Sequence, residues 1–378
     1  MHYLTDEKLK EAIDVYNTYK TDQACADHLG IAKSTFQHRR KTAVGRGYSP
    51  DHDMVHMAAE GHMVKGVSTL YGKDGSVTAQ WIKTDLDKER QELAQKAVIE
   101  AMCEEIPKAK KVDPPKKGLE NLMAVYPVGD HHMGMLAWGE ETGGDNYDLK
   151  KSEDVLCRAM DYLVDAAPAS KTSAILLLGD FLHFNGRSQE TVKGGHAMDA
   201  DSRFQKVVRA AIKSIRYLVR AALQKHDTVH LIIELGNHDA DPMAVFMEMF
   251  YSHYEDEPRV IADRSPRNIH VVEFGKNLIA THHGDKIKMD KLPLVIATDF
   301  PKIWGRTDFR VVHTGHVHHD HIKEHPGLTT ESHGILAPKD EYAASGGWRA
   351  RQTMKLVVYH KEFGEVGRTI ATPQMIGE

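Results

Sequence analysis

Cysteine and long apolar segments are scarce in this sequence. Its three cysteines, Cys25, Cys103 and Cys157, are odd in number and widely spaced, which excludes a disulfide framework and is typical of a reducing compartment. The longest apolar run, Ala174 to Leu178, is far too short to cross a bilayer, and residues 1 to 10 lack the apolar core of a secretion signal. We therefore expect a cytoplasmic protein with no membrane partner.

An excess of charge of one sign is also missing. The net charge is −5 over 378 residues, which excludes a uniformly basic nucleic-acid coat protein and makes local charge more informative than the sum. Hydrophobic residues make up 41% and charged residues 27%, so extensive disorder is excluded. We find no internal repeat or low-complexity tract. The length suits one core of ordinary size with smaller units attached.

Histidine is present in surplus. The chain contains 25 histidines, and many of them stand beside Asp, Asn or Gly in short polar segments. Imidazole is the commonest metal ligand among side chains. The composition therefore indicates a metal site.

Residues 1–48 predict a small helical unit. Apolar spacing indicates a first helix around Leu9 and Ile13, and a second helix that ends at Gly30. A third helix, 33–42, follows across the short turn that a helix-turn-helix requires.

Residues 60–118 predict an intermediate segment. Apolar residues on both sides of an Asp-Gly turn indicate a β-hairpin over 63–84, and helical spacing returns at 92–106. The run 108–118 is basic and contains two adjacent prolines, which a helix interior does not accommodate. We place the boundary of the main domain in this run.

Residues 119–378 predict an α/β domain. Strand-like apolar runs alternate with longer segments, of which 155–164 and 204–218 have helical spacing. The runs 355–359 and 366–371 predict closing strands. Alternation of strands and helices indicates an α/β sheet. The main strand-like runs are 122–128, 174–178, 229–235, 278–281 and 311–314.

Each of these five runs ends in a polar cluster. Polar side chains at the carboxyl ends of strands face the usual binding crevice of an α/β sheet. Asp-x-His and His-x-His spacing puts alternate side chains on one side of an extended segment, where both reach one ion. Glycine beside each cluster permits a sharp turn and leaves room for a substrate. The clusters are GDHH at 129–132, GDFLH at 179–183, GNHD at 236–239, HHGD at 282–285 and GHVH at 315–318.

The side-chain types in these clusters limit the metal. Carboxylate, amide and imidazole ligands without thiolate suit hard or borderline divalent ions. Two ions about 4 Å apart, bridged by one aspartate, share a hydroxide and clamp a phosphoryl group. We expect two divalent ions, with Mn favoured and Fe, Zn, Ni and Mg as alternatives.

In this order the clusters resemble those of the calcineurin-like metallophosphoesterases, whose pattern is D-x-H, G-D-x-x-[DH], G-N-H-[DE], a His followed by Gly, and G-H-x-H. The resemblance covers roughly the last two-thirds of the chain and implies a four-layer α/β/β/α sandwich. It also implies that Asp180 bridges the two ions. The ligands that it implies are Asp130, His132, Asp180 and His318 for one ion, and Asp180, Asn237, His283 and His316 for the other.

The resemblance assigns catalytic roles to two further histidines. His238 is expected to stabilise the developing charge or to protonate the leaving oxygen. His183 stands where nucleases of the superfamily have His and phosphatase-like members more often have Asp. His282 and His283 both fit the fourth cluster, and we choose His283 because it directly precedes glycine. We expect the remaining neighbours to orient ligands or to lie exposed, namely His131, His313, His319, His321 and His333.

A glycine-rich stretch at 184–200 follows the second cluster. Arg187 and His196 in this stretch are candidates for substrate contact, because they come soon after the bridging aspartate. The alternative is an ordinary surface loop.

Residues 24–40 resemble the helix-turn-helix of small homeodomain-like DNA-binding modules. From 33 to 46 the chain carries Lys and Arg but no acid, which gives a face that attracts phosphate. Ala32 stands where such helices often have a Ser or Thr cap. The alternative is a small three-helix module for protein interaction or oligomerisation, so a homo-oligomer stays open. The candidate DNA contacts are Lys33, Ser34, Thr35, Gln37, His38, Arg39, Arg40 and Lys41.

Taken together, these features predict a dinuclear phosphodiesterase that acts on nucleic acid, and we favour a DNA nuclease. The order of helical unit, hairpin, basic linker and phosphoesterase is similar to that of certain phage-encoded phosphoesterases, which implies repair or replication in a bacterial cytoplasm. About sixty residues follow the fifth cluster, whereas double-strand-break repair nucleases of this superfamily add a capping domain there.

Two alternatives to a nuclease stay open. One is a small-molecule phosphodiesterase or phosphomonoesterase in which the helical unit serves targeting. The other is a DNA-binding regulator with a degenerate metal site, against which the complete ligand set argues.

Overall fold

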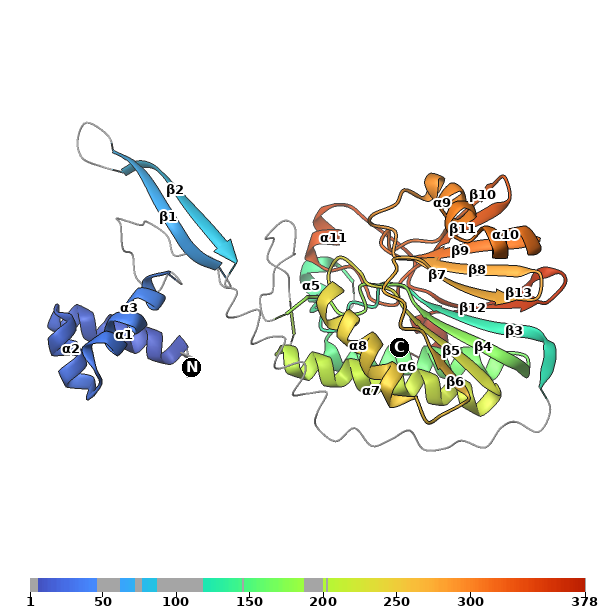
Figure 1. The fold of residues 1–378 in the computed structure, drawn as a ribbon, viewed down its shortest axis with the longest axis horizontal. Helices are drawn as coiled ribbons and strands as arrows, with labels where there is room; N and C mark the ends of the chain where they lie inside the picture. Colours follow the sequence, from blue (N-terminus) through green and yellow to red (C-terminus); the bar gives the residue numbers. More distant parts are fainter. Residues whose placement is uncertain are drawn as a thin grey trace. The chain divides into compact units, whose positions relative to one another are not determined.

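The computed structural model describes residues 6–45, 62–71, 77–86, 118–144, 146–186, 200–201 and 203–377. The chain divides into two compact units, Met1–Leu93 and Ala94–Glu378 (Figure 1). The predicted helix at 92–106 and nearly all of the predicted boundary at 108–118 lie outside the described residues, as do Arg187 and His196. These predictions stay predictions.

The first unit begins with the three helices that the sequence predicts. They are α1 (Asp6–Tyr19), α2 (Asp22–Leu29) and α3 (Lys33–Gly45). The hydroxyl of Thr21 caps α2, and Gly30 ends it with a left-handed backbone at φ 62°. The helices enclose a small core of Leu9, Ala12, Ile13, Cys25, Ala26, Phe36 and Ala43.

The predicted hairpin is also present. Strands β1 (His62–Tyr71) and β2 (Val77–Leu86) pair antiparallel as an isolated two-stranded sheet. Of the described side chains near its turn, Ser68 and Leu70 are exposed.

The second unit contains a six-stranded sheet with the order β13-β12-β3-β4-β5-β6. The four strands from β3 to β6 run parallel, whereas β12 lies antiparallel to β3 and to β13. The strands are β3 (Leu119–Val128), β4 (Ser170–Leu177), β5 (Thr228–Ile233), β6 (Val260–Ala262), β12 (Met354–His360) and β13 (Gly364–Ala371).

A five-stranded sheet with the order β10-β11-β9-β8-β7 faces the first one. The sequence predicts β8 and β9 but misses β7, β10 and β11. The short edge strand β10 has the polar sequence HIKEH and no buried residue, so it carries no apolar pattern. The strands are β7 (His270–Phe274), β8 (Asn277–His282), β9 (Phe309–Thr314), β10 (His321–His325) and β11 (Leu328–Ser332).

Helices cover the outer face of each sheet (Figure 1). Buried residues of α6, α7 and α8 form one core with the six-stranded sheet, and residues of α9 and α10 pack on the five-stranded sheet. These helices are α6 (Leu149–Ala166), α7 (Phe204–Lys225), α8 (Ala240–His253), α9 (Leu292–Asp299) and α10 (Pro301–Arg306). The short elements are α5 (Gly139–Thr142), α11 (Glu341–Ser345), and the 3-10 turns Met289–Lys291 and Pro373–Ile376.

A separate core lies between the two sheets. Alternate residues of β3 and β4 point either toward the second sheet or toward α6 and α7, so these strands are apolar on both faces. This explains why they read as continuous apolar runs. The predicted four-layer α/β/β/α sandwich is therefore confirmed. The core between the sheets contains Met123, Val125, Ala174, Leu176, Leu178, Ile232, Val272, Phe274, Ile279, Val311, Val357 and Tyr359.

No helix in the described parts of the chain is long and apolar enough to cross a membrane.

We expect Leu176→Ala to destabilise the second unit, because Leu176 is fully buried between the sheets. A Leu-to-Ala cavity in a core costs about 2–5 kcal/mol. Urea unfolding followed by circular dichroism should show this loss, and Leu294→Ala is the matched control because Leu294 is 74% exposed on α9. Equal unfolding midpoints for the two variants would contradict the layered core.

Candidate metal centre

The five predicted clusters follow strands that end at one edge of the two sheets. The loops after β3, β4 and β5 carry Asp130, Asp180 and Asn237, and those after β8 and β9 carry His283 and His316. Parallel neighbouring strands bring their carboxyl ends together at such an edge. Local sequence therefore sets the residue types, and the sheets bring them together.

Asp130, His132 and His318 form the first group of ligand atoms. Nε2 of His132 lies 3.1 Å from Nε2 of His318. Nε2 of His318 lies 3.7 Å from Oδ1 of Asp130. The three side chains are close enough to hold one ion, and their carboxylate and imidazole donors suit a divalent transition metal.

Asp180, His283 and His316 form the second group. Nε2 of His283 lies 3.3 Å from Oδ2 of Asp180 and 3.0 Å from Oδ1 of Asn237. The other ring nitrogen of His283, Nδ1, lies 2.8 Å from the carbonyl oxygen of Leu178. A donor Nδ1–H in that position directs the lone pair of Nε2 into the group, as in many histidine metal ligands.

Backbone donors hold the two aspartates between the groups. The N–H of His316 donates to both carboxylate oxygens of Asp130, at 2.8 Å each. The N–H of His238 donates to Oδ1 of Asp180 at 2.7 Å, which leaves Oδ2 facing His283. Nδ1 of His283 lies 3.9 Å from Oδ1 of Asp130, so the groups are contiguous. The predicted bridging role of Asp180 stays a prediction.

The ligand loops contain strained backbone. Among the described residues, five non-glycine residues have positive φ, and four of them are predicted ligands. Such left-handed conformations are costly and cluster at functional sites. The four are His132 at φ 49°, Asp180 at 48°, His316 at 69° and His318 at 57°.

Close approach explains two of the cluster glycines. A Cβ at Gly236 would lie 2.0 Å from Oδ1 of Asp180, and a Cβ at Gly315 would lie 2.5 Å from Oδ2 of Asp130. No side chain fits at either position without displacing the carboxylate.

Burial dominates the electrostatics of the centre. Desolvation raises the pKa of Asp130 and lowers the pKa of His132 well below its ordinary range. Desolvation also opposes the charge of Asp180, but the hydrogen bond with His283, the charges of His283 and His238 and the backbone N–H of His238 together outweigh it and lower the pKa of Asp180. Buried carboxylates and neutral imidazoles are ligands that a bound divalent cation stabilises. The residues therefore fit metal ions.

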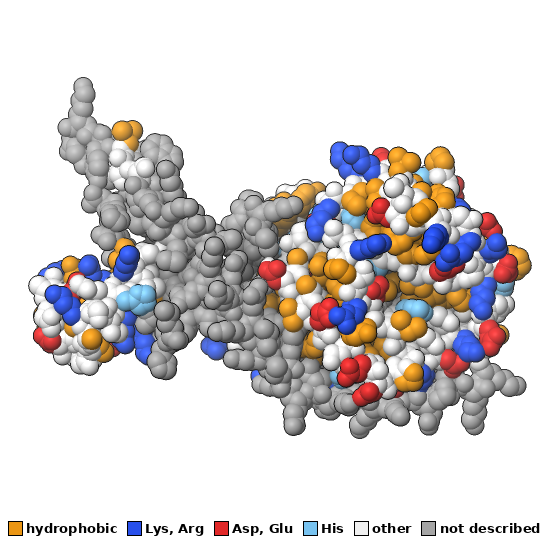
Figure 2. All heavy atoms as spheres, in the orientation of Figure 1, with side chains coloured by type: hydrophobic (Ala, Val, Ile, Leu, Met, Phe, Trp, Pro, Cys, Tyr) orange, Lys and Arg blue, Asp and Glu red, His pale blue; other side chains and the backbone are white. Residues whose placement is uncertain are grey.

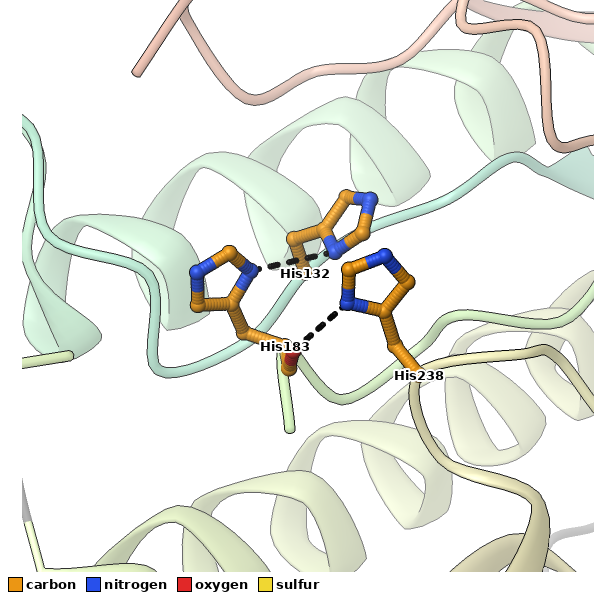
Figure 3. Close-up of side chains that lie close together, drawn as sticks. All are labelled: His132, His183 and His238. Atoms are coloured by element: carbon orange, nitrogen blue, oxygen red, sulfur yellow. Dashed lines mark hydrogen bonds between the residues drawn. The ribbon is translucent and has the colours of Figure 1, made fainter. Parts of the chain in front are cut away.

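His183 and His238 lie against the first group (Figure 3). The ring of His183 lies 3.2 Å from that of His132, Nδ1 to Nδ1, and Nδ1 of His238 lies 3.0 Å from the carbonyl oxygen of His183. Nε2 of His183 is buried without a hydrogen-bond partner, and burial lowers the pKa of this histidine to about 3. The three rings are also close enough to hold an ion.

The other histidines near the clusters have different surroundings. His131 is buried and bonded to Ser152, and His282 is buried outside the groups of potential ligands found among the described residues. His319 and His321 are exposed.

A further buried group contains His313, Glu331 and His333, which are close enough to hold an ion. His313 contacts His333 and the hydroxyl of Tyr359. Arg368 and Lys355 already pair with Glu331, so the carboxylate there has its counter-charges. We assign this group a structural role.

Sequence reasoning gave no role to Asp239, although it closes the third cluster. This buried carboxylate accepts the N–H of Leu182 at 2.8 Å and that of Gly236 at 3.1 Å. It thereby ties the loop after β4 to the loop after β5. The sequence signal that could have indicated this role is the acid that follows Asn-His in the third cluster.

The predicted DNA contacts on α3 divide into two sets. Arg40 pairs with Asp22 at 3.1 Å and lies over the ring of Tyr16 at 4.2 Å, and Gln37 donates to Asp22 at 3.1 Å. These two side chains are therefore engaged within the helical unit, and Arg39 is half-buried. The predicted DNA contacts that are exposed on α3 are Lys33, Ser34, Thr35, His38 and Lys41.

Comparison with known proteins gives distant matches. No protein-family model matches the chain, and no curated protein matches it. Among solved structures, Vps29 of Chaetomium thermophilum is similar at 12% identity and a TM-score of 0.31, over 66% of this chain and 96% of that one.

Two structures described as phosphoesterases match at a similar level. An archaeal phosphodiesterase has 12% identity and a TM-score of 0.33, over 66% of this chain and 99% of its own. A conserved uncharacterized protein of Streptococcus pneumoniae TIGR4, described as a predicted phosphoesterase, has 8% identity and a TM-score of 0.26, over 67% and 99%. The assignment of the site therefore rests on this chain's own residues and their geometry.

We expect Gly236→Ala to weaken metal binding about 10- to 100-fold, the range typical of lost support around a ligand. The added Cβ would displace Asp180. Titration with Mn²⁺ followed by calorimetry measures the effect. Gly305→Ala is the matched control, because a Cβ there meets nothing within 4 Å. Unchanged affinity in Gly236→Ala would show that Asp180 is not a ligand.

Metal affinity should rise with pH. Burial lowers the pKa of His283, but its hydrogen bond with Asp180 and the charges of Asp180 and Asp130 raise the pKa from 6.5 to about 10. An ion binds Nε2 of His283 only after the proton on this nitrogen leaves. Each pH unit below that pKa therefore strengthens metal binding by up to about tenfold. Calorimetry in buffers of different ionisation enthalpy should detect the released proton. The release should fall in His283→Asn, and an affinity independent of pH would refute this account.

Proposed function

We propose that this chain is a metal-dependent phosphodiesterase of the calcineurin-like metallophosphoesterase superfamily that acts on nucleic acid, with DNA as the favoured substrate. One observation carries the proposal. The ligand residues of five separate sequence clusters converge at one edge of the two sheets, in two contiguous groups of carboxylate, amide and imidazole donors.

Each group would hold one divalent ion, and Mn²⁺ suits the mixture of oxygen and nitrogen donors. Asp130, His132 and His318 would hold the first ion, and Asp180, Asn237, His283 and His316 the second. When bound, two such ions supply an activated water and stabilise charge on phosphoryl oxygens.

His238 is suited to act on the leaving group. Its Nδ1 is fixed by the carbonyl oxygen of His183, so Nε2 is the nitrogen that exchanges a proton. Nε2 lies 4.0 Å from Oδ2 of Asp180, at the rim of the centre, and the side chain is 22% exposed. A histidine in this position protonates or hydrogen-bonds a departing oxygen.

A nucleic-acid substrate is supported by the helical unit. Lys33, His38 and Lys41 are exposed on α3, in a helix that has no acidic residue, and such a face attracts phosphate. On the visible face of the second unit, charges of both signs are interspersed (Figure 2). Attraction to a polyanion is therefore expected from α3 and from the metal ions rather than from this face of the second unit.

The engagement of Arg40 and Gln37 with Asp22 favours a second candidate function. If α3 uses these side chains for its own packing, the helical unit has less surface for DNA and suits assembly or targeting. The enzyme would then act on a small phosphodiester or phosphomonoester.

We expect the protein with Mn²⁺ to hydrolyse both bis(p-nitrophenyl) phosphate and end-labelled DNA. His238→Ala should lower the rate by about 10²–10⁴-fold, the usual contribution of a proton-transferring side chain, while the bound Mn²⁺ stays unchanged. His321→Ala, an exposed histidine on β10, is the matched control.

Two outcomes would redirect the assignment. Hydrolysis of small esters without any cleavage of DNA or RNA would favour the second candidate. A protein that binds Mn²⁺ yet turns over no phosphoester would refute the enzymatic function.

A further inference from the structure

Three large aromatic side chains are exposed on segments that join the metal centre. Trp138 is 56% exposed, Tyr342 66% and Trp348 56%. Aromatic side chains of this size normally bury most of their surface. Large aromatic side chains left exposed on segments that meet are typical of an interaction surface. We refer to these three residues as the aromatic surface.

Trp138 belongs to the loop that supplies the first ligands. This loop runs from Asp130 through His132 to the start of α5, and the N–H of Met135 donates to the carbonyl oxygen of His132 at 3.0 Å. This short, hydrogen-bonded connection fixes the position of Trp138 relative to His132.

Tyr342 and Trp348 lie on the segment between β11 and β12, which is fastened to the His316–His318 loop. Asp320, just past His318, accepts the N–H of Gly334 at 2.7 Å and the hydroxyl of Thr353 at 3.4 Å. The segment is therefore held at both ends beside a loop that carries two predicted ligands.

The two aromatic segments also meet each other. Helices α5 and α11 are in contact, and they lie together at one end of the second unit (Figure 1). Nζ of Lys339 donates to the carbonyl oxygen of Gly143 at 3.2 Å, which joins the start of α11 to the end of α5. The aromatic surface thus spans two segments that are joined to each other, and each of these is continuous with or hydrogen-bonded to a loop that carries predicted ligands.

Hydrogen bonds hold the backbone that carries the two rings after α10, Tyr342 and Trp348. The N–H of Trp348 donates to the carbonyl oxygen of Ala343 at 3.0 Å. The guanidinium of Arg349 donates to the carbonyl oxygens of Ala343, Ala344 and Trp348. The rings of Tyr342 and Trp348 lie 5.1 Å apart at 62°. An arrangement fixed in this way loses little entropy when a planar ligand stacks on it.

Charge around the aromatic surface is mixed. Arg351 is exposed nearby in sequence, but so are Glu140, Glu141 and Glu341. A surface of this kind does not select a polyanion by charge alone. It offers ring faces, and unpaired nucleobases are the planar groups that a phosphodiester substrate of nucleic acid carries.

We propose that the aromatic surface stacks unpaired bases of the nucleic-acid strand whose phosphodiester lies at the metal centre. The proposal rests on the proposed function and deepens it, because it makes single-stranded nucleic acid the preferred substrate. In a duplex the base faces are already stacked on one another and are closed to the rings.

The test compares Tyr342→Ala/Trp348→Ala with wild type on a short oligo-dT strand and on an abasic strand of the same length. Stacking on aromatic side chains is worth about tenfold or more in affinity for each base. We expect the double variant to bind oligo-dT at least about tenfold more weakly, and both proteins to bind the abasic strand equally weakly. Phe363→Ala is the matched control, since Phe363 is 68% exposed beyond β12.

Hydrolysis of bis(p-nitrophenyl) phosphate separates this inference from the proposed function. The double variant should retain the wild-type kcat on this small ester, because at saturation its phosphoryl group reacts at the metal centre alone. If oligo-dT and the abasic strand bind wild type equally, or the double variant binds oligo-dT as wild type does, base stacking is refuted. If wild type hydrolyses no ester, the proposed function fails, and binding of oligo-dT still decides the stacking.

Discussion

Two buried carboxylates, Asp130 and Asp180, set the constraint on which the rest of the centre depends. They follow the adjacent parallel strands β3 and β4, and each is at most 1% exposed. An ionised carboxylate taken out of water costs several kcal/mol unless opposite charge and hydrogen bonds compensate it. Backbone N–H groups from the loops after β5 and β9 supply part of this compensation. Imidazoles, and the divalent ions for which the donor set is suited, supply the rest. Five loops converge because no single loop contains enough partners.

The convergence requires backbone conformations that most residues avoid. Left-handed φ values at His132, Asp180, His316 and His318 cost about 1–3 kcal/mol each, so the surrounding structure has to impose them. The double-sided cores of the two sheets provide that rigidity, since strands buried on both faces cannot shift to relieve strain in the loops that follow them. The buried side chain of Asp239 adds to this rigidity, because it ties two ligand loops together by accepting hydrogen bonds from their backbone N–H groups.

In the proposed function, reaction chemistry and substrate choice would lie largely in different parts of the chain. The metal loops at the strand ends would fix where a phosphoryl group reacts, and apart from His183 their residues carry little information about what is attached to it. Recognition would fall to surfaces outside the ligand set. The exposed face of α3 offers cations for phosphates, whereas Trp138, Tyr342 and Trp348 offer ring faces for bases. Placing both kinds of surface on one chain suits a long, flexible substrate better than a compact one.

The sequence by itself determined the α/β class and the residue types of the candidate centre, and its resemblance to the metallophosphoesterases implied the four layers. The class and the residue types are local properties, because each cluster joins an apolar run to glycine and ligand side chains within a few residues. The sequence favoured His283 over its neighbour His282 as a ligand, but only the tertiary structure places the His283 ring against Asp180 and leaves His282 outside the ligand groups found among the described residues. The tertiary structure also turned Arg40 toward Asp22, and it brought α5, which begins after Trp138, into contact with α11, which ends shortly before Trp348. Contacts of this kind join residues that are far apart in the chain, or they depend on which side of a strand end faces the site. No local pattern specifies them.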